Sequence, residues 1–406
     1  MARSLATLPS GTRVTDFVSL GVLADRLPLD KIHEVLQQTG RQSQRQRHLP
    51  AHVVVYYVVA LALYMEVSYE EVLRCLLEGL AWLGLPVQRL RRTGRSGISQ
   101  ARTRLGAEPL RRLYEDLVVP IAQPQTRGAH YRQWTLVSLD GSTLDLADTA
   151  ENEADFGRPV AARGQSGFPQ LRFVSLVENG THVLFGARLG GYATAELELA
   201  RKVVERLQPG WLCLADRLFF GYKLWQHASQ SGADLLWRVK TGWDLPPLKR
   251  LSDGSYLSQI YPSAQDRERD RGGQIVRVID YRLTGLPDVE PFYRLVTTVV
   301  DEHQAPAEEL AALYHERWEI EGALDELKTH LRGRKVVLRS KTPELVRQEF
   351  YGLMLAHYAV RGLMHEAALR ADADPDELSF VHAVRVIRRK IMTVRSFPPS
   401  AGLKTS

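Results

Sequence analysis

Apolar residues recur at every third or fourth position through the first third of the chain, and this period is typical of helices with one buried face. The recurrence begins near Ser19 and continues to about Val118. Within it, Tyr69–Leu83 predicts an amphipathic helix, whereas Val53–Met65 is apolar throughout. The latter stretch is shorter than the roughly 20 residues of a membrane-spanning helix, so it predicts a helix buried inside the protein. We expect this third of the chain to be all helix.

A glycine-containing break interrupts the helical pattern at Thr93–Gly97. The next predicted helix is Ile98–Leu105, with Ser96 or Ser99 available as its N-cap. This outline is typical of a helix-turn-helix-like unit, whose second helix presents side chains to DNA. Proline and glycine residues between positions 120 and 128 then mark a linker.

After the linker the apolar period shortens to two, which indicates strands. Asn179-Gly180 joins the second and third strands as a hairpin. Helices at Ala193–Leu207 and to about Ser231 separate the last three strands. The order strand, strand, strand, helix, strand, helix, strand matches a ribonuclease-H-like core, whose first and fourth strands are adjacent and parallel. The five predicted strands are Trp134–Leu139, Leu171–Val177, Thr181–Leu189, Trp211–Ala215 and Leu235–Lys240.

A segment rich in glycine, proline and charge, at about 241–303, predicts a β insertion with strands at Gln274–Leu283 and Phe292–Val300. Helices follow at Ala307–Leu331, Pro343–Arg370 and Asp376–Arg395. The expected fold class is α/β, a ribonuclease-H-like mixed sheet core with a β insertion, preceded by an all-helical N-terminal DNA-binding domain. We place the boundary at residue 130, so that residues 1–130 form the helical domain, while residues 131–406 hold the sheet core, the insertion and the C-terminal helices.

The composition is that of an ordinary globular protein, with 44% hydrophobic and 25% charged residues. Cys75 and Cys213 have no metal-ligand spacing, so neither a zinc site nor a disulfide framework is encoded. No secretory signal and no membrane-spanning stretch is visible. These features predict a cytoplasmic protein without membrane contact.

The positive charge is concentrated in the N-terminal third, where residues 1–134 hold 18 Lys and Arg against 11 Asp and Glu. Eight arginines but a single acid, Glu108, lie between Arg89 and Arg112. Such a segment favours a polyanion, because each neutralised phosphate releases counterions. A solvated, arginine-rich helix face is the alternative. The residues expected to contact DNA here are Arg91, Arg92, Arg95, Gln100, Arg102 and Arg104.

Two aspartates, Asp140 and Asp216, directly follow predicted core strands. Ligands of open α/β sheets gather at the carboxyl ends of strands, so these carboxylates are well placed to hold ions. The alternative is an ordinary turn-forming aspartate, since Asp140 precedes Gly141 and two hydroxyl residues.

The predicted helix Ala307–Leu331 carries a third polar group. At about 100° per residue, Tyr314, Arg317, Glu321 and Lys328 share one helix face. A solvated salt-bridge surface is the ordinary explanation of such residues. Other acids lie on the same helix, so helix geometry does not select Glu321. They include Glu316, Glu319, Asp325 and Glu326.

Phosphodiester cleavage supplies a chemical reason for three carboxylates beside basic residues. The attacking and leaving oxygens must be stabilised together, which two Mg²⁺ ions about 3.5 to 4 Å apart accomplish. Hard divalent ions need oxygen ligands, and carboxylates provide them. Lys, Arg and Tyr around such a site would bind phosphates.

The chain resembles the DDE transposases of the insertion sequence 4 family over most of its length. Its helical N-terminal block is similar to that family's N-terminal domain, which implies that residues 1–130 recognise DNA ends and that residues 131–406 hold the catalytic core. The matching motifs are Tyr314-x2-Arg317-x3-Glu321-x6-Lys328, Leu139-Asp140-Gly141, Ala215-Asp216-Arg217-Leu218-Phe219 and the stretch from Thr143 to Pro159.

The resemblance implies a DNA transposase that cleaves at element ends and transfers the strands to target DNA. It implies that Asp140, Asp216 and Glu321 are the catalytic and metal-binding triad for two Mg²⁺ ions, with Mn²⁺ as a substitute. The implied partners are double-stranded DNA, as terminal inverted repeats and target, and a second copy in a homodimeric synaptic complex. A nucleoid-associated location follows from such a substrate. The residues implied to contact DNA at the cleaved end are Tyr314, Arg317 and Lys328.

Family members that form a hairpin intermediate stack a flipped base on a tryptophan. Here Trp243 is the candidate for that platform, whereas Trp237 and Trp318 are expected in the core.

Two other functions stay open from the sequence. One is a catalytically silent, transposase-derived DNA-binding protein, against which the intact triad argues. The other is a metal-dependent nuclease on the same core that cuts without strand transfer.

Overall fold

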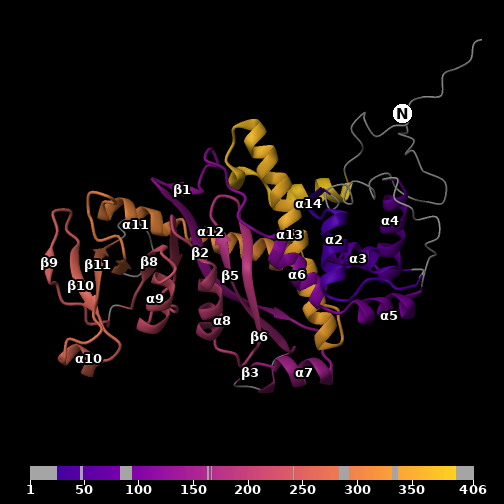
Figure 1. Ribbon diagram of the computed structural model, residues 1–406, viewed down its shortest axis with the longest axis horizontal. Coiled ribbons are helices and arrows are strands. Elements are labelled where there is room, and N and C mark those ends of the chain that lie inside the picture. The colour runs from indigo at the N-terminus through magenta and orange to yellow at the C-terminus, as the bar shows by residue number, and fades with distance from the viewer. Residues whose placement is uncertain are drawn as a thin grey trace, which may run out of the picture. The chain divides into compact units, whose positions relative to one another are not determined.

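The computed structural model describes residues 25–45, 49–82, 94–161, 164–165, 167–240, 242–282, 292–331 and 337–389 (Figure 1). The chain divides into two compact units. The helical unit combines Met1–Val118 with Glu326–Ala368 and Glu377–Ser406, and the sheet unit combines Val119–Asp325 with Leu369–Asp376. The helical unit thus combines C-terminal helices with N-terminal ones. The functional division at residue 130 stays a prediction.

Helices dominate the described part of the helical unit. In α3 (Ala51–Leu63), every side chain from Val53 to Leu63 is buried, as a segment apolar on all its faces requires. This confirms the predicted buried helix. The other helices of the unit are α2 (Leu29–Gln38), α4 (Tyr69–Trp82), α5 (Arg95–Leu105), α6 (Glu108–Leu117), the π-helix η3 (Glu326–Leu331), α13 (Pro343–Ala371, up to Ala368) and α14 (Phe380–Arg389).

The helix α13 packs against the N-terminal helices of this unit. A Cβ atom on Gly352 would lie 2.9 Å from the carbonyl oxygen of Val58, so glycine permits a close approach of α13 to α3. The Gln348 amide donates hydrogen bonds to the carbonyl oxygens of Arg102 and Gly106, at 3.0 and 2.7 Å. The N-terminal helices therefore share their core with a helix from the far end of the sequence.

Helix α5 begins earlier than predicted. Its N-cap is Gly94, in an extended conformation and without a side-chain cap, so Ser96 and Ser99 lie inside the helix rather than at its start. The prediction that either serine caps the helix is wrong. An N-cap residue needs non-helical backbone angles, and both serines already have helical ones.

The sheet unit is built on a ten-stranded sheet with the order β6-β5-β2-β7-β8-β12-β11-β10-β9, and β1 lies beside β2. A separate pair is formed by β3 (Val160–Ala161) and β4 (Gly164–Gln165). The strands of the large sheet are β1 (His130–Tyr131), β2 (Trp134–Asp145), β5 (Gln170–Glu178), β6 (Val183–Gly191), β7 (Trp211–Ala215), β8 (Asp234–Arg238), β9 (Lys249–Arg250), β10 (Tyr256–Ile260), β11 (Gln274–Tyr281) and β12 (Tyr293–Thr297).

The helical segments of the sheet unit lie between and after these strands. They are α7 (Ala150–Phe156), α8 (Glu196–Val203), the 3-10 helix η2 (Val204–Arg206), α9 (Tyr222–Ser229), α10 (Ala264–Glu268), α11 (Ala307–His315), α12 (Trp318–Asp325) and the 3-10 helix η4 (Pro375–Glu377, up to Asp376).

The first five long strands confirm the ribonuclease-H-like core. β2, β5 and β6 form an antiparallel meander, β7 pairs parallel with β2, and β8 pairs parallel with β7. The predicted hairpin also occurs, although its loop runs from Asn179 to His182 before β6 begins. Gly180 has a φ of +76°, and a Cβ there would lie 2.6 Å from the carbonyl oxygen of Arg127.

Helices cover both faces of the core sheet. Alternate residues of a strand point to opposite faces. Leu136 of β2 and Leu214 of β7 share a buried cluster with Leu310 and Tyr314 of α11. On the opposite face, the ring of Trp237 in β8 contacts α9, where the centroid of the Trp225 ring lies 5.3 Å away. α12, which carries Glu321, thus directly follows α11, which is packed on the sheet.

The β insertion continues the core sheet. β12 pairs antiparallel with β8, and β11, β10 and β9 follow in turn. β11 and β12 confirm the two predicted strands as far as the structure describes them, since residues 283–291 lie outside the described ranges. The short β9 and β10 were not predicted, because two to five residues carry too little of a period to detect.

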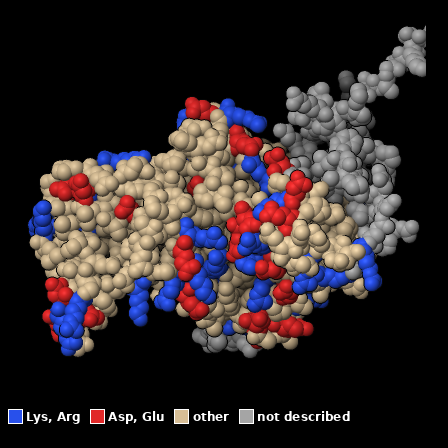
Figure 2. All heavy atoms as spheres, in the orientation of Figure 1, with Lys and Arg blue, Asp and Glu red and all other residues tan. Residues whose placement is uncertain are grey.

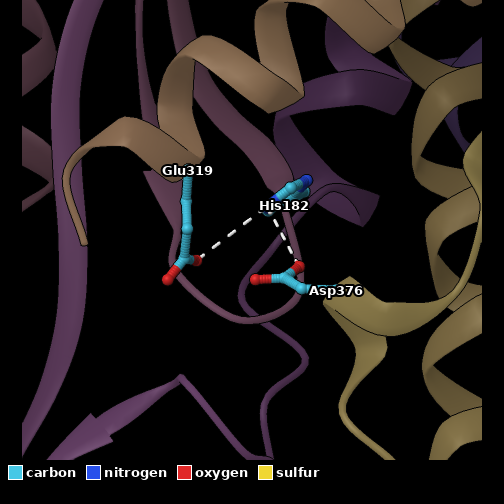
Figure 3. Close-up of side chains that lie close together, drawn as sticks. All are labelled: His182, Glu319 and Asp376. Atoms are coloured by element: carbon cyan, nitrogen blue, oxygen red, sulfur yellow. Dashed lines mark ion pairs between the residues drawn. The ribbon is translucent and has the colours of Figure 1, made fainter. Parts of the chain in front are cut away.

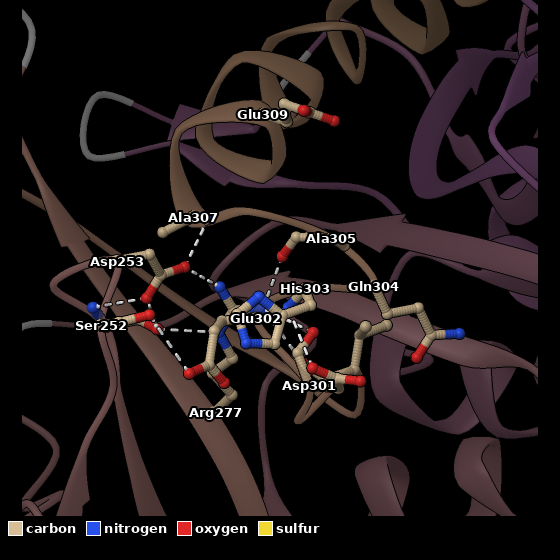
Figure 4. Close-up of polar contacts among 12 residues, drawn as sticks. Ser252, Asp253, Arg277, Asp301, Glu302, His303, Gln304, Ala305, Ala307 and Glu309 are labelled. Atoms are coloured by element: carbon tan, nitrogen blue, oxygen red, sulfur yellow. Dashed lines mark hydrogen bonds and ion pairs between the residues drawn. The ribbon is translucent and has the colours of Figure 1, made fainter.

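Arg277 joins the insertion to the start of α11 (Figure 4). Its guanidinium is fully buried, forms an ion pair with Asp253 and donates hydrogen bonds to Ser255 at 2.8 Å and to the carbonyl oxygen of Ala305 at 2.6 Å. Asp253 in turn accepts a hydrogen bond of 2.8 Å from the backbone N–H of Ala307, the first residue of α11.

The single helix predicted for Ala307–Leu331 is wrong, because α11, α12 and η3 are three segments. The chain turns at Glu316 and Arg317. There the side-chain amide of Asn179 donates a hydrogen bond of 3.1 Å to the carbonyl oxygen of Glu316 and so competes with the helical ladder. Tyr314 and Glu321 consequently do not share one helix face, because Tyr314 precedes the turn and Glu321 follows the turn.

Candidate active site

Asp140 and Asp216 lie side by side on neighbouring parallel strands. The parallel ladder between β2 and β7 ends with Leu139 opposite Ala215, so the next residue on each chain segment is an aspartate. The alternation of side chains places both on the face that α11 covers. The prediction that the first strand ends at Asp140 is wrong: β2 continues to Asp145, because β5 keeps pairing with it.

Arg317 links the carboxylates of two different elements. Its guanidinium lies 3.6 Å from Asp140 on β2 and 3.4 Å from Glu321 on α12. The Arg317 residue is 8% exposed, whereas the Glu321 side chain is 46% exposed. The structure therefore brings Asp140, Asp216 and Glu321 into one neighbourhood, with a buried guanidinium among them and solvent on the side of Glu321.

Partly buried acids dominate the electrostatics of this neighbourhood. Burial raises the pKa of Asp140 to about 6, and the charges of Asp216 and Glu196 act in the same direction. The N–H of Gly141, which donates to Asp140 at 2.7 Å, and the charge of Arg317 oppose this rise. Glu196 was not predicted, because an acid in the first turn of α8 is an ordinary partner of a helix N-terminus.

The pKa of Arg317 is raised despite its burial. Burial alone lowers the pKa of a guanidinium, but here Tyr314 and the three surrounding carboxylates outweigh it. Arg317 consequently stays charged and neutralises part of the acidic cluster.

Tyr314 supports the site from the hydrophobic core and does not face solvent. It is buried in the core cluster, and its hydroxyl donates a hydrogen bond of 3.4 Å to the carbonyl oxygen of Ala215, the residue before Asp216. Burial also raises the pKa of its phenol. The expected direct contact between Tyr314 and DNA does not fit this placement, because the apolar stripe of α11 carries Tyr314 into the core.

The tryptophans differ from expectation in one case. Trp237 is fully buried, as expected, but Trp318 is 59% exposed and lies next to Arg317. The expectation that Trp318 belongs to the core is wrong, because the turn at Glu316 rotates the start of α12. Trp243 is half-buried, and its ring meets that of Phe220 edge-on with centroids 4.7 Å apart. Trp318 therefore offers the more accessible ring.

The residues of the helical unit that are expected to contact DNA divide into three groups. Arg91 and Arg92 lie outside the described residues. Arg95, Gln100 and Arg104 are exposed on α5, consistent with an interface. Arg102, in contrast, is 3% exposed.

The expected DNA contact of Arg102 does not fit the structure. Its guanidinium donates hydrogen bonds to Gln348 at 2.8 Å and to Ser340 at 2.9 Å. Its spacing from Ile98 and Leu105 explains this placement, because all three lie on the buried face of α5.

Acidic side chains offset part of the arginine-rich segment. Arg111 pairs with Glu108 and Glu115, and Arg112 pairs with Asp116, so these two arginines are neutralised within α6. On the face of the molecule drawn in Figure 2, basic and acidic atoms are interspersed. Lys328 lies in η3 of the helical unit, and its predicted contact with the cleaved end stays a prediction.

A second cluster of potential ligands lies in the sheet unit. Among the described residues, His182, Glu319 and Asp376 have ligand atoms that all lie within 4.8 Å of one another. Burial, and then the charge of Asp376, raises the pKa of Glu319 to about 9.

Comparison with known proteins assigns both parts of the chain. Residues 17–115 match the family described as insertion element 4 transposase N-terminal, and residues 134–359 match the transposase DDE domain. The chain is 29% identical over 383 residues to transposase InsG for insertion sequence element IS4 of Escherichia coli, covering 93% of this chain and 84% of that protein. It is 26% identical over 226 residues to putative transposase InsZ of the same organism, covering 54% and 71%.

A solved piggyBac transposase synaptic complex with hairpin DNA covers 92% of this chain and 79% of its own, with 11% identity and a TM-score of 0.46. That likeness is too distant to support an inference. Within the described ranges, no helix has the length and apolar character needed to traverse a membrane. The match of the DDE domain covers more than half of the sequence, so the chain belongs to the DDE transposases, with an N-terminal region that matches the insertion element 4 transposases.

Proposed function

We propose that this transposase uses Asp140, Asp216 and Glu321 as its catalytic triad in cut-and-paste transposition. The observation that carries the proposal is the meeting of three carboxylates from β2, from the end of β7 and from α12 around the buried guanidinium of Arg317. Like charges repel, so three carboxylates from separate elements need positive charge among them, which Arg317 supplies in part and bound cations would complete.

The donor set fits divalent ions. All of the triad's ligand atoms are carboxylate oxygens, which Mg²⁺ and Mn²⁺ prefer, and a cation would relieve the repulsion that acts on the half-buried Asp140. Asp140, Asp216 and Glu321 would hold two such ions, Mg²⁺ or Mn²⁺. When bound, these ions would stabilise the attacking and leaving oxygens of the phosphodiester.

The protein side chains around the triad would orient the DNA. Arg317 has a planar guanidinium that can turn from the carboxylates to the oxygens of a phosphate, to which it would bind in a bidentate manner. The exposed ring of Trp318 beside it would stack on a base displaced at the cleaved end. Tyr314 would hold α11 against the strand that ends before Asp216.

Recognition of the element ends would fall to the helical unit. Arg95, Gln100 and Arg104 are exposed on α5, and we propose that they contact the terminal inverted repeats, together with Arg91 and Arg92. Lys328 would add a contact at the cleaved end. Because two ends must be held together, the working complex would be a homodimer on double-stranded DNA, in association with the nucleoid.

A cleavage assay with Glu321→Gln tests the proposal. The substrate is a plasmid that carries both ends of the encoding element, with Mg²⁺ present. We expect DNA binding to persist while cleavage falls by at least about 100-fold. Changing a residue that only supports a metal ligand lowers activity about 10- to 100-fold, and loss of the ligand itself should lower activity more. Glu308→Gln, an exposed acid on α11, is the matched control and should cleave normally.

The same assay separates the alternatives. Cleavage that never yields joined products would favour a nuclease without strand transfer. Binding without any cleavage by the unmodified chain would favour a silent DNA-binding protein. Equal cleavage by Glu321→Gln and the unmodified chain would refute the triad.

A further inference from the structure

His182, Glu319 and Asp376 converge from three segments of the sheet unit (Figure 3). His182 is the last residue of the loop between β5 and β6, Glu319 lies in the first turn of α12, and Asp376 lies in η4. The imidazole Nε2 lies 3.1 Å from Asp376 Oδ1 and 3.9 Å from Glu319 Oε2. The three side chains point toward one common space.

The spacing of these atoms suits one small cation. A tetrahedral ion about 2.1 Å from each ligand places the ligand atoms roughly 3.4 Å apart. The two distances from the imidazole bracket that value, and all three ligand atoms lie within 4.8 Å of one another. Small side-chain rotations would therefore complete the coordination.

The charge of the cluster also favours a cation. The His182 and Glu319 side chains are 9% and 11% exposed, and Glu316 adds a third carboxyl group beside Glu319. A bound cation would favour the ionised form of these carboxyl groups, which burial and their mutual repulsion otherwise disfavour. The Asp376 side chain, 31% exposed, leaves a route by which an ion can enter.

We propose that His182, Glu319 and Asp376 form a structural site for a divalent transition metal, with Zn²⁺ as the best match. One imidazole nitrogen with two carboxylate oxygens is a mixed donor set that suits Zn²⁺ better than Mg²⁺. The backbone N–H of Gly180 donates to Glu319 and fixes the orientation of this ligand, a support that metal-binding carboxylates commonly have.

This site is distinct from the catalytic triad but lies close to it along the chain. Glu319 is two residues before Glu321 and two after Arg317, so a metal ion on Glu319 would tie the first turn of α12 to the β5–β6 loop and to η4. The ion would thereby hold α12 in the place from which Glu321 and Arg317 reach Asp140.

Zinc binding by the full-length, untagged chain tests the inference. The background is the triple variant Asp140→Asn, Asp216→Asn, Glu321→Gln, which removes the proposed catalytic ligands, so that neither cleavage activity nor the triad decides the result. After equilibration with ZnCl₂ and dialysis, we expect one zinc ion per chain by elemental analysis. Zinc should also raise the melting temperature of this protein.

Two ligand variants and a matched control complete the design. Asp376→Asn changes an exposed residue, and His182→Asn retains a residue that tolerates the positive φ of 58° at this position. Each should weaken zinc binding by at least about tenfold and abolish the rise in melting temperature. Asp372→Asn removes an acid from the same segment outside the cluster and should bind zinc normally.

Either of two results would overturn the inference. One is the absence of bound zinc in the triple variant. The other is zinc binding that Asp376→Asn and His182→Asn leave unchanged.

Discussion

Arg317 illustrates how one side chain can hold an acidic site together. Its guanidinium pairs with Asp140 and Glu321, and the local acids keep it charged although it is buried. Without that charge, carboxylates from β2 and α12 would face each other in a medium where repulsion is strong. We infer that Arg317 organises the triad in the absence of DNA and metal, and that phosphate and cations take over its charge in the working complex.

His52 offers a residue-scale prediction about acid stability. Burial, with a smaller effect of His33, lowers the pKa of His52 to about 4 from its ordinary value of 6.5. The imidazole of His52 therefore binds a proton more readily in the unfolded chain than in the folded one. The contribution of neutral His52 to the free energy of unfolding is complete above pH 6.5 and is lost as the pH falls toward 4. After allowance for solvent screening, we expect the loss between about pH 7 and 5 to be roughly 1 kcal/mol.

Urea unfolding of His52→Gln at these two pH values measures that contribution. The variant should lose less stability on acidification than the unmodified chain, because its side chain has no proton to gain. An identical loss in both proteins would contradict the prediction.

At the scale of elements, the insertion and the helix that leads to the site are one connected structure. Arg277 in β11 and Asp253 between β9 and β10 reach the first turn of α11 and the residues just before it (Figure 4). α11 packs on the core strands that precede Asp140 and Asp216. The insertion thus supports the element from which the chain turns toward Arg317.

Removal of Asp253 should therefore destabilise more than removal of an ordinary surface acid. Asp253→Asn leaves the fully buried guanidinium of Arg277 without its carboxylate partner. Removing one partner of a buried ion pair lowers the free energy of unfolding by about 3 kcal/mol. Asp244→Asn is the matched control, because its ion pair with Arg267 is on the surface of the same insertion and is worth roughly 0.5 kcal/mol. Urea denaturation of both variants gives the comparison, and equal effects would contradict it.

At the scale of the whole molecule, the helical unit is assembled from distant parts of the chain. The α2–α6 segment buries its apolar faces partly against α13, and the hydrogen bonds of Arg102 and Gln348 cross between them. Arg339 likewise donates a hydrogen bond of 2.8 Å to the carbonyl oxygen of Val67. The N-terminal helices on their own would expose the surface that α13 covers.

Residues 1–130 expressed alone should accordingly lack a cooperative thermal unfolding transition. The physical reason is the buried guanidinium of Arg102 and the glycine contact at α3, both of which need α13. Circular dichroism against temperature measures this, and adding a separate fragment of residues 326–406 should restore the transition. A fragment 1–130 that unfolds cooperatively by itself would show that the N-terminal helices form an independent domain.

Sequence patterns alone determined the features that depend on neighbouring residues. The unbroken apolar run predicts α3, alternation predicts the core strands, and Asn179-Gly180 predicts the hairpin. These signals are local, because helical and strand periods repeat within a few residues. The expected strand order comes from the match of the predicted order of elements to the ribonuclease-H-like core. The resemblance to insertion sequence 4 transposases, rather than any local period, makes Asp140, Asp216 and Glu321 the candidate triad.

Only the tertiary structure decided what depends on contacts between distant residues. Asn179 breaks the long helix at Glu316, β5 extends β2 past Asp140, and Gln348 draws Arg102 into the core. The exposure of Trp318 and the convergence of His182, Glu319 and Asp376 have the same origin. In each case the deciding partner lies elsewhere in the sequence, so no local period could contain the information.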